Sequence, residues 1–242
     1  MTDLADWEWH LVPLSSLSSP TADTDDWTLV VDSGGGGRGG STGPAPSYQS
    51  SAVGNSAGNS GSGTCNVPAG TGSGNLLVAI VMTFNVNTPT SPPAGWTQPA
   101  GSYSGAGGCY VDVATRYATG SEPGSYTWTG NGFMALCLLN YAGGTGLDGS
   151  VASAGVNPAA TVGAPSVTAS AANELWLACF MDNLGYTWTA PAGFTLRNTV
   201  HQGSFQEMIV CEKLVTAAGA TGTATATASH SWQLAGASVL VY

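Results

Sequence analysis

Carboxylates are the side chains of this chain that could do acid–base chemistry, since two of them at a suitable separation can hydrolyse a glycosidic bond. After residue 43 they stand at Asp112, Glu122, Asp148, Glu174, Asp182, Glu207 and Glu212. No spacing among them singles out a catalytic pair. Three more stand together in DTDD at 23–26, but that segment lacks the glycine and the final glutamate of an EF-hand loop. We interpret it as a solvated acidic turn or a patch that pairs with a basic partner surface.

Other signatures of catalysis lack the structural context that they need. His10, His201 and His230 stand too far apart for a zinc motif. The segments GGSTG at 39–43 and GNSAG at 54–58 fit G-x-S-x-G, but neither joins a buried strand to a helix. The tract GGGGRG at 34–39 is not followed by the helix that would hold a pyrophosphate. The sequence therefore predicts a non-enzymatic protein without metal or cofactor, with a glycan hydrolase or esterase as a remote alternative.

Five cysteines are widely spaced, form no CxxC pair and have an odd total. They are Cys65, Cys109, Cys137, Cys179 and Cys211. We interpret them as buried free thiols that act as small hydrophobic side chains, with a single disulfide or a metal site as the alternatives.

Aromatic side chains are the best candidates for binding, because the apolar face of a sugar ring stacks on an aromatic plane. The alternative is packing in a core or between protomers, which we favour for Trp96, Tyr126, Trp128 and Phe194 because their positions recur along the chain. YTW at 186–188 precedes one of two similar turns and has no counterpart before the other. The candidate glycan-binding residues are Tyr186, Trp188, Tyr103 and Trp232.

The composition excludes several classes of partner. Only 7% of the 242 residues are charged, and the net charge is −10, so the clustered Lys and Arg needed for nucleic-acid binding are missing. The longest apolar run, LLVAIVM at 76–82, is too short to span a bilayer, and the acidic start MTDLADWEWH is unlike a secretory signal. We expect neither nucleic-acid nor membrane binding, and assembly in a cytoplasm. The 35 glycines favour short strands joined by turns.

An internal repeat organises the chain from about residue 44 onward. PPAGWT at 92–97 returns as APAGFT at 190–195, and GNLLVAIVM at 74–82 aligns with NELWLACFM at 173–181. VDVATRYAT at 111–119 matches MIVCEKLVT at 208–216, and FMALCLLNY at 133–141 matches QLAGASVLVY at 233–242, with both last segments ending in Tyr. The sequence thus contains two homologous halves, at about 48–141 and 147–242.

Period-2 alternation of apolar residues in VDVATRY and MIVCEKL predicts strands with one buried face. LLVAIVM and LWLACFM are apolar on both faces, as expected for central sandwich strands or strands covered by a neighbour. The frequent turn signals favour antiparallel connections. We predict an all-β fold: one antiparallel, jelly-roll-like β-sandwich at 44–242, built from the two halves. The large Tyr126 and Trp128 align with the small Ala224 and Ala226, so we expect bulky residues of one half to fill space left by the other.

Residues 1–43 have no repeat partner and differ in composition. They carry seven of the fourteen acids and end in a glycine-rich tract. Exposed aromatics on a free tail would be a liability, so a partner is implied. We predict an extended N-terminal attachment arm whose partner-docking residues are Trp7, Trp9, Trp27, Leu29 and Val31.

Residues 46–242 resemble a β-sandwich domain that is common in bacteriophage virion proteins such as tail fibres, appendages and capsid-surface components. The motifs that carry the resemblance are NLLVA at 75–79, PAGWT at 93–97, Arg116, ATG at 118–120, Glu122-Pro123 and YTW at 126–128. The second half lacks both EP and YTW at the matching places.

The resemblance implies a virion structural protein assembled in the host cytoplasm, as a capsid decoration, a head fibre or a short tail-associated component. Its partners would be other virion proteins and further copies of itself, with a trimer among the options because such appendages are symmetric oligomers. A module that binds a host surface glycan is the alternative.

Overall fold

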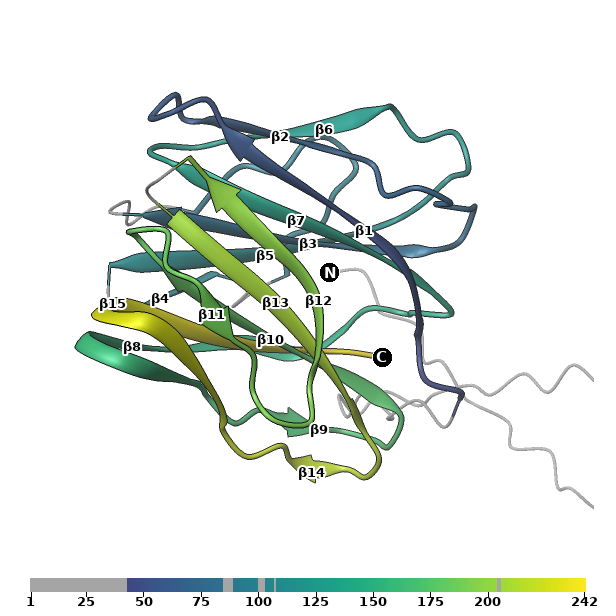
Figure 1. Ribbon diagram of the computed structural model, residues 1–242. Helices are drawn as coiled ribbons and strands as arrows, with labels where there is room; N and C mark the ends of the chain where they lie inside the picture. Colours follow the sequence, from purple (N-terminus) through teal and green to yellow (C-terminus); the bar gives the residue numbers. More distant parts are fainter. Residues whose placement is uncertain (1–42, 85–88, 100–102, 107, 204–205) are drawn as a thin grey trace, which may run out of the picture. The chain divides into compact units, whose positions relative to one another are not determined.

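The computed structural model describes residues 43–84, 89–99, 103–106, 108–203 and 206–242. The docking residues expected in the arm, Trp7, Trp9, Trp27, Leu29 and Val31, lie outside this part of the chain. Every regular element of the described residues is a β-strand, and the strands pair antiparallel. The described part of the chain holds no helix that could cross a membrane. Two main sheets pack face to face (Figure 1), which confirms the predicted all-β sandwich.

The first half of the chain builds a seven-stranded sheet. Its order is β4 (Tyr103–Ala106), β5 (Cys109–Tyr117), β3 (Leu76–Phe84), β7 (Met134–Ala142), β1 (Ser47–Ser56), β2 (Ser62–Asn66) and β6 (Ser125–Thr129). The sheet curls, so that β2 and β6 cover the outer face of β3.

The second half builds the other sheet. Its order is β11 (Trp188–Thr189), β15 (Ala224–Val241), β10 (Glu174–Asp182), β13 (Gln206–Val215) and β12 (Thr195–Gln202), with β8 (Leu147–Ala164) paired to β15. A small separate sheet joins β9 (Thr168–Ala169) to β14 (Gly219–Ala220).

The two sheets have equivalent topologies once the long strands are divided. β1 pairs with β7 and β2 pairs with β6. In the second half, β8 pairs along both parts of β15, from Leu147 opposite Val241 to Ala164 opposite Ala224. Therefore β8 corresponds to β1 and β2 joined, and β15 corresponds to β6 and β7 joined. Each homologous half is one sheet of the sandwich.

The cross-strand registers correct one detail of the sequence alignment. Leu76 lies opposite Tyr141, whereas its counterpart Leu175 lies opposite Val241. Tyr141 and Val241 both enter the core between the sheets. The match between Tyr141 and Tyr242 is therefore wrong by one residue, because side chains alternate along a strand and a shift of one places them on opposite faces.

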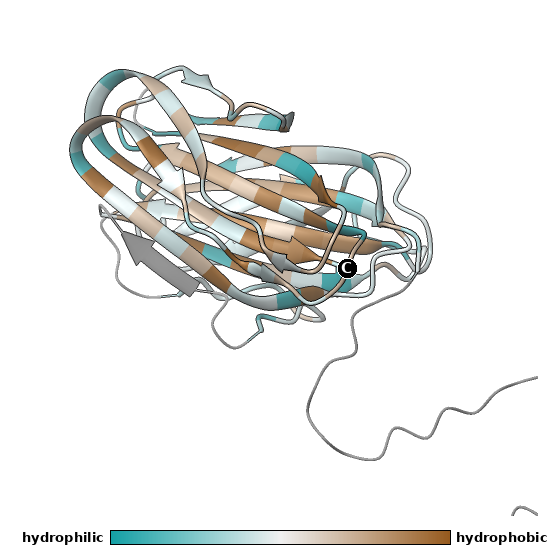
Figure 2. Cartoon of the chain, turned by 90° about the horizontal axis from the view of Figure 1, so that it is seen from below, coloured by the Kyte–Doolittle hydropathy of each residue, from teal (hydrophilic) through white to brown (hydrophobic). Residues whose placement is uncertain are grey.

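Apolar residues on both faces of β3 and β10 produce three hydrophobic cores. Leu76, Val78 and Ile80 enter the central core between the sheets together with Leu175 and Leu177. The alternate residues of β3 and β10 enter two outer cores, one on the outside of each sheet. Figure 2 shows the hydrophobic residues, in brown, along the strands. The central core draws on both halves, as one sandwich requires.

The packing of bulky against small residues occurs within each half, which corrects the expectation that it bridges the halves. Tyr126 and Trp128 pack in the first outer core, whereas Ala224 and Ala226 lie in the second. The second outer core is filled by large side chains of its own half, including Trp176. Side chains on outer faces cannot meet, because two sheets and the central core separate them.

The sandwich has two distinct ends. β1 lies against β12, and Gln202 at the end of β12 donates its side-chain amide to the carbonyl of Ser56 at the end of β1, at 3.1 Å. We call this the loop end. At the opposite end, Gly43 accepts a hydrogen bond from the Asn173 side chain at 3.2 Å, and Tyr242 completes the last strand pair beside Thr145. We call this the base end, and the first described residue, Gly43, lies there.

The separation of the outer cores gives an additivity test. We expect Trp128→Ala to lower the free energy of unfolding by about 3–5 kcal/mol and Ile209→Val, in the second outer core, by about 0.5–1.5 kcal/mol. In urea denaturation the double variant should show the sum within about 0.5 kcal/mol. Val81→Ala is the matched control, because Val81 lies in the same core as Trp128. The effects of Val81→Ala and Trp128→Ala on the free energy of unfolding should not be additive. Coupling between Trp128 and Ile209 above about 1 kcal/mol would contradict the separate cores.

Candidate functional site

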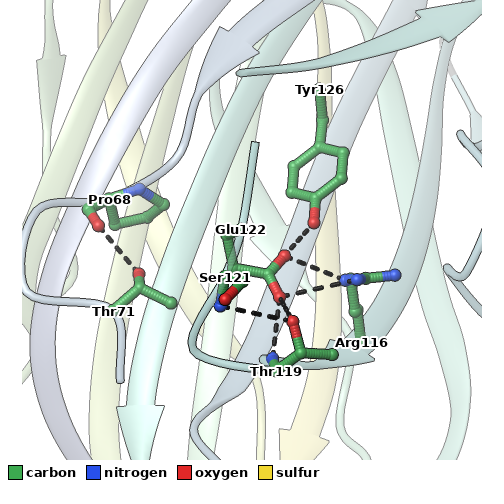
Figure 3. Close-up of polar contacts among 7 residues, drawn as sticks. All are labelled: Pro68, Thr71, Arg116, Thr119, Ser121, Glu122 and Tyr126. Carbon is green, nitrogen blue, oxygen red and sulfur yellow. Dashed lines mark hydrogen bonds and ion pairs between the residues drawn. The ribbon is translucent and has the colours of Figure 1, made fainter. Parts of the chain in front are cut away.

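Glu122 is the centre of a polar network at the end of β5 (Figure 3). Its carboxylate accepts hydrogen bonds from the Thr119 backbone N–H at 2.7 Å, the Thr119 hydroxyl at 3.0 Å and Arg116 Nε at 3.0 Å. The hydroxyl of Tyr126 on β6 also donates to it. The Glu122 side chain is 5% exposed. The network therefore ties the loop between β5 and β6 to both strands.

Burial raises the pKa of Glu122, but the hydrogen bonds from Thr119, Tyr126 and Arg116 outweigh it and lower the pKa to about 2. Arg116 also lies 5.5 Å from the centre of the Tyr126 ring. The arginine is thus held by a charge on one side and an aromatic face on the other. These residues carry the sequence resemblance, and their geometry is that of a structural clamp.

The second half keeps one part of this arrangement. Arg116 lies opposite Leu77 and Lys213 opposite Trp176, which confirms that the two basic residues are equivalent. Lys213 lies 5.7 Å from the ring centre of Phe194, the aromatic of the second PAG turn. Both basic residues thus contact an aromatic ring, but the ring differs: it is Tyr126 on β6 in the first half and Phe194 of the PAG turn in the second, where the carboxylate has been lost.

The two PAG segments are matching turns. The backbone N–H of Trp96 donates to the carbonyl of Pro93, and that of Phe194 to Pro191, both at 3.2 Å. Both aromatic rings then pack on the outer face of their own sheet, Trp96 5.1 Å from Trp128 between ring centres. The interpretation of these aromatics as core residues is confirmed.

The seven carboxylates of the sandwich are all withdrawn from solvent. Glu212 accepts a hydrogen bond from the Tyr141 hydroxyl at 2.7 Å and forms an ion pair with Arg197 at 2.5 Å. Glu207 lies 3.0 Å from Nδ1 of His201. Asp148 and Glu174 both hold Ser170, through its backbone N–H and its hydroxyl. These contacts use the carboxylates to join strands and loops.

Two buried aspartates hold the loops that precede the PAG turns. In the first half, Asp112 accepts hydrogen bonds from the Thr90 backbone N–H at 2.7 Å and the Gln98 amide at 2.8 Å. In the second half, Asp182 Oδ1 accepts from the backbone N–H groups of residues 184–186, and Oδ2 accepts from Trp188 Nε1 at 2.8 Å. Burial raises the pKa of Asp112 to about 6 and that of Asp182 above its usual range.

Of the candidate glycan-binding residues, Tyr186 and Trp232 lie at the loop end. The Tyr186 ring stacks on His230, with 4.9 Å between ring centres. Trp232 follows on β15 and is 42% exposed. Trp188 packs 6.1 Å from Phe180, so it supports the loop. The backbone of Tyr103 lies in β4, and its side chain is outside the described part of the structure.

Sequence reasoning missed His230 and Leu184 as members of this group. Leu184 is 38% exposed and follows Asp182 by two residues. His230 follows the buried Ala226 and Ala228 at alternate positions along β15. The pairing register shifts between Thr227 and Trp232, so this alternation does not predict where the His230 side chain points.

A hollow of about 600 Å³ also opens in the first half, near the end of β3. The described residues that line it are Asn59, Ser60, Gly61, Phe84, Gly130, Asn131, Gly132 and Phe133. None of these carries an ionisable side chain. Within the described residues, no three His, Cys, Asp or Glu side chains gather closely enough to hold a metal ion. All five cysteines are buried free thiols, as predicted.

The two PAG turns offer a matched pair of substitutions. Gly95 and Gly193 both have a left-handed φ, of 83° and 79°, so alanine at either should cost about 1 kcal/mol or more. A Cβ at Gly95 would also collide with Arg116 Nη1, whereas a Cβ at Gly193 meets nothing within 4 Å. Thermal or urea unfolding should therefore show Gly95→Ala to be worse by about 2 kcal/mol, through the Arg116–Glu122 contact. Equal effects would argue against the clamp.

Glu122 and Asp112 should give stability–pH profiles of opposite sign. The contribution of Glu122 is complete above its ordinary pKa of 4.5 and is lost as pH falls toward about 2. The stability difference between the wild type and Glu122→Gln should shrink over that window. Asp112 has a pKa raised from 3.8 to about 6, so wild-type stability relative to Asp112→Asn should fall as pH rises from about 4 to about 6.

Denaturant unfolding at a series of pH values measures both profiles. Parallel profiles for the two variants, or a difference for Glu122→Gln that grows on acidification, would contradict the assigned shifts.

No family model matches the chain, and no curated protein or solved structure matches it.

Proposed function

We propose that this chain is a non-enzymatic surface protein of a bacteriophage virion, attached through its N-terminal arm. The resemblance of residues 46–242 to virion β-sandwich domains suggests the setting. The observation that carries the proposal is that the two ends of the sandwich differ. The first described residue, Gly43, lies at the base end, and the unrepeated loop at 183–188 lies at the opposite end. A protein anchored by its arm would present that loop outward.

The charge distribution supports a display role. Seven of the fourteen acids belong to the arm, and the seven acids of the sandwich are withdrawn from solvent. Among the Asp, Glu, Lys and Arg residues that the structure describes, only Lys213 is exposed. Apart from Lys213, the charged side chains of the described sandwich are withdrawn into internal contacts, and its surface carries little charge. The acidic arm would supply complementarity to a basic docking surface.

The structural use of each carboxylate supports the non-enzymatic part of the proposal. A general acid or base must reach a substrate proton, whereas these groups already accept hydrogen bonds or ion pairs from their own chain. The protein would then serve as a capsid decoration, a head fibre or a short tail-associated component. Symmetric copies of the chain would assemble around the attachment point.

Deletion of residues 1–42 tests the role of the arm. The cut leaves Gly43 and its contact with Asn173, and all three cores lie within the retained residues. We expect a folded protein that no longer incorporates into particles, measured by immunoblot of purified virions. The full-length Trp7→Ala/Trp9→Ala/Trp27→Ala variant should be lost from particles as well, and Tyr117→Ala, on the exposed base of the sandwich, should incorporate normally. A truncated protein that still incorporates would overturn the arm assignment.

A further inference from the structure

Four aromatic and apolar side chains at the loop end are exposed or partly exposed, and we call them the loop-end patch: Leu184, Tyr186, His230 and Trp232. Tyr186 stacks on His230 at 4.9 Å between ring centres. Leu184 and Trp232 are 38% and 42% exposed. The side-chain amide of Asn183 donates to Gln233 at 3.3 Å, which joins the two segments that carry the patch.

The patch is held in place before any ligand arrives. Asp182 fixes the loop at three successive backbone N–H groups, from Leu184 to Tyr186. It also binds Trp188 Nε1, and Ser229 donates its backbone N–H to the Thr187 carbonyl at 2.9 Å. A preformed surface loses little conformational entropy on binding, which favours recognition of a small ligand.

The surroundings of the patch are polar but uncharged. Asp182 is fully buried and its two oxygens are occupied. Glu207, which lies opposite it in the sheet, is buried and paired with His201. The nearby polar groups are the hydroxyls of Thr187 and Ser229 and the amide of Asn183. A complementary ligand therefore has a flat apolar face, hydroxyl groups and no net charge, and a pyranose ring meets these requirements.

The size of the patch favours a sugar over a protein. A whole aromatic side chain presents about 150–250 Å², but Leu184 and Trp232 are only 38% and 42% exposed, and Tyr186 is partly buried. Together they offer on the order of 300 Å², against the roughly 800 Å² per partner of a stable protein interface. A second copy of this chain would thus find too little apolar surface here, whereas one or two sugar units would cover it.

We propose that the loop-end patch binds a neutral hexopyranose unit of a surface polysaccharide, with Trp232 and Tyr186 as the stacking rings. Trp188 is a positioning residue that ties the loop to Asp182. The inference rests on the proposed function in one respect, namely that the loop end faces away from the particle. Binding itself is a property of the free chain and does not require particle attachment.

The test uses the full-length chain in solution. Maltotriose, cellotriose, lactose and N-acetylchitotriose are titrated at millimolar concentration, with sulfated dextran as the anionic counterpart. The readouts are tryptophan fluorescence and the indole N–H signal of Trp232 in an NMR spectrum. We expect at least one neutral saccharide to shift this signal saturably and sulfated dextran to leave it unchanged.

Trp232→Ala should weaken that binding by about tenfold or more, and Tyr186→Ala by a similar factor. Tyr117→Ala is the matched control, because Tyr117 is an exposed aromatic, 53% accessible, near the base end. It should bind the saccharide like the wild type. An unchanged melting temperature of Trp232→Ala would show that its weaker binding comes from loss of the contact with the saccharide and not from unfolding.

Three outcomes would overturn the inference. They are the absence of a shift with every neutral saccharide, equal loss of binding in Tyr117→Ala, and a Trp232 signal that depends on protein concentration, which would mark an interface between copies. Incorporation of the chain into particles is measured separately. A protein that incorporates normally and binds no saccharide would refute the sugar site alone.

Discussion

The need to bury both faces of the two central strands determines the rest of this structure. β3 and β10 are apolar at successive positions, so one face of each enters the central core and the other requires a separate cover. Each half supplies that cover by curling its own sheet: β2 and β6 return over β3, and the corresponding parts of β8 and β15 return over β10. The result is a sandwich with three apolar layers and no helix in the described residues.

This constraint also explains where the two halves could diverge. The central core must fit both sheets at once, and Leu76 and Leu175, like Met82 and Met181, remain the same on its two sides. Each outer core meets only residues of its own half, so volumes could be redistributed there without disturbing the partner sheet. A tryptophan of the outer core stands on β6 in the first half, at Trp128, and on β10 in the second half, at Trp176. The loops that lie over the outer cores diverged with them.

The sequence was sufficient to predict what depends on local pattern. Alternation predicted the strands, the Gly of each PAG turn predicted a tight turn, and the match of Arg116 to Lys213 holds in the registers. The alignment of Tyr141 with Tyr242 failed because a one-residue slip is invisible in two similar apolar strings. The Asp182 clamp could not be predicted, since its partners are mainly backbone N–H groups, which every residue except proline carries.

The loop before the PAG turn is held differently in the two halves. In the first half, Asp112 on β5 holds a loop that approaches the sheet through Ser91 and Thr129. In the second half the clamp is Asp182 on β10, and the equivalent bridge is the short β11, opposite Thr227. Because Asp182 stands on the strand that leads into the loop, it holds the backbone of residues 184–186 at the rim, where Leu184 is exposed and Tyr186 is partly buried. One buried carboxylate thus fixes the backbone of the loop at the loop end.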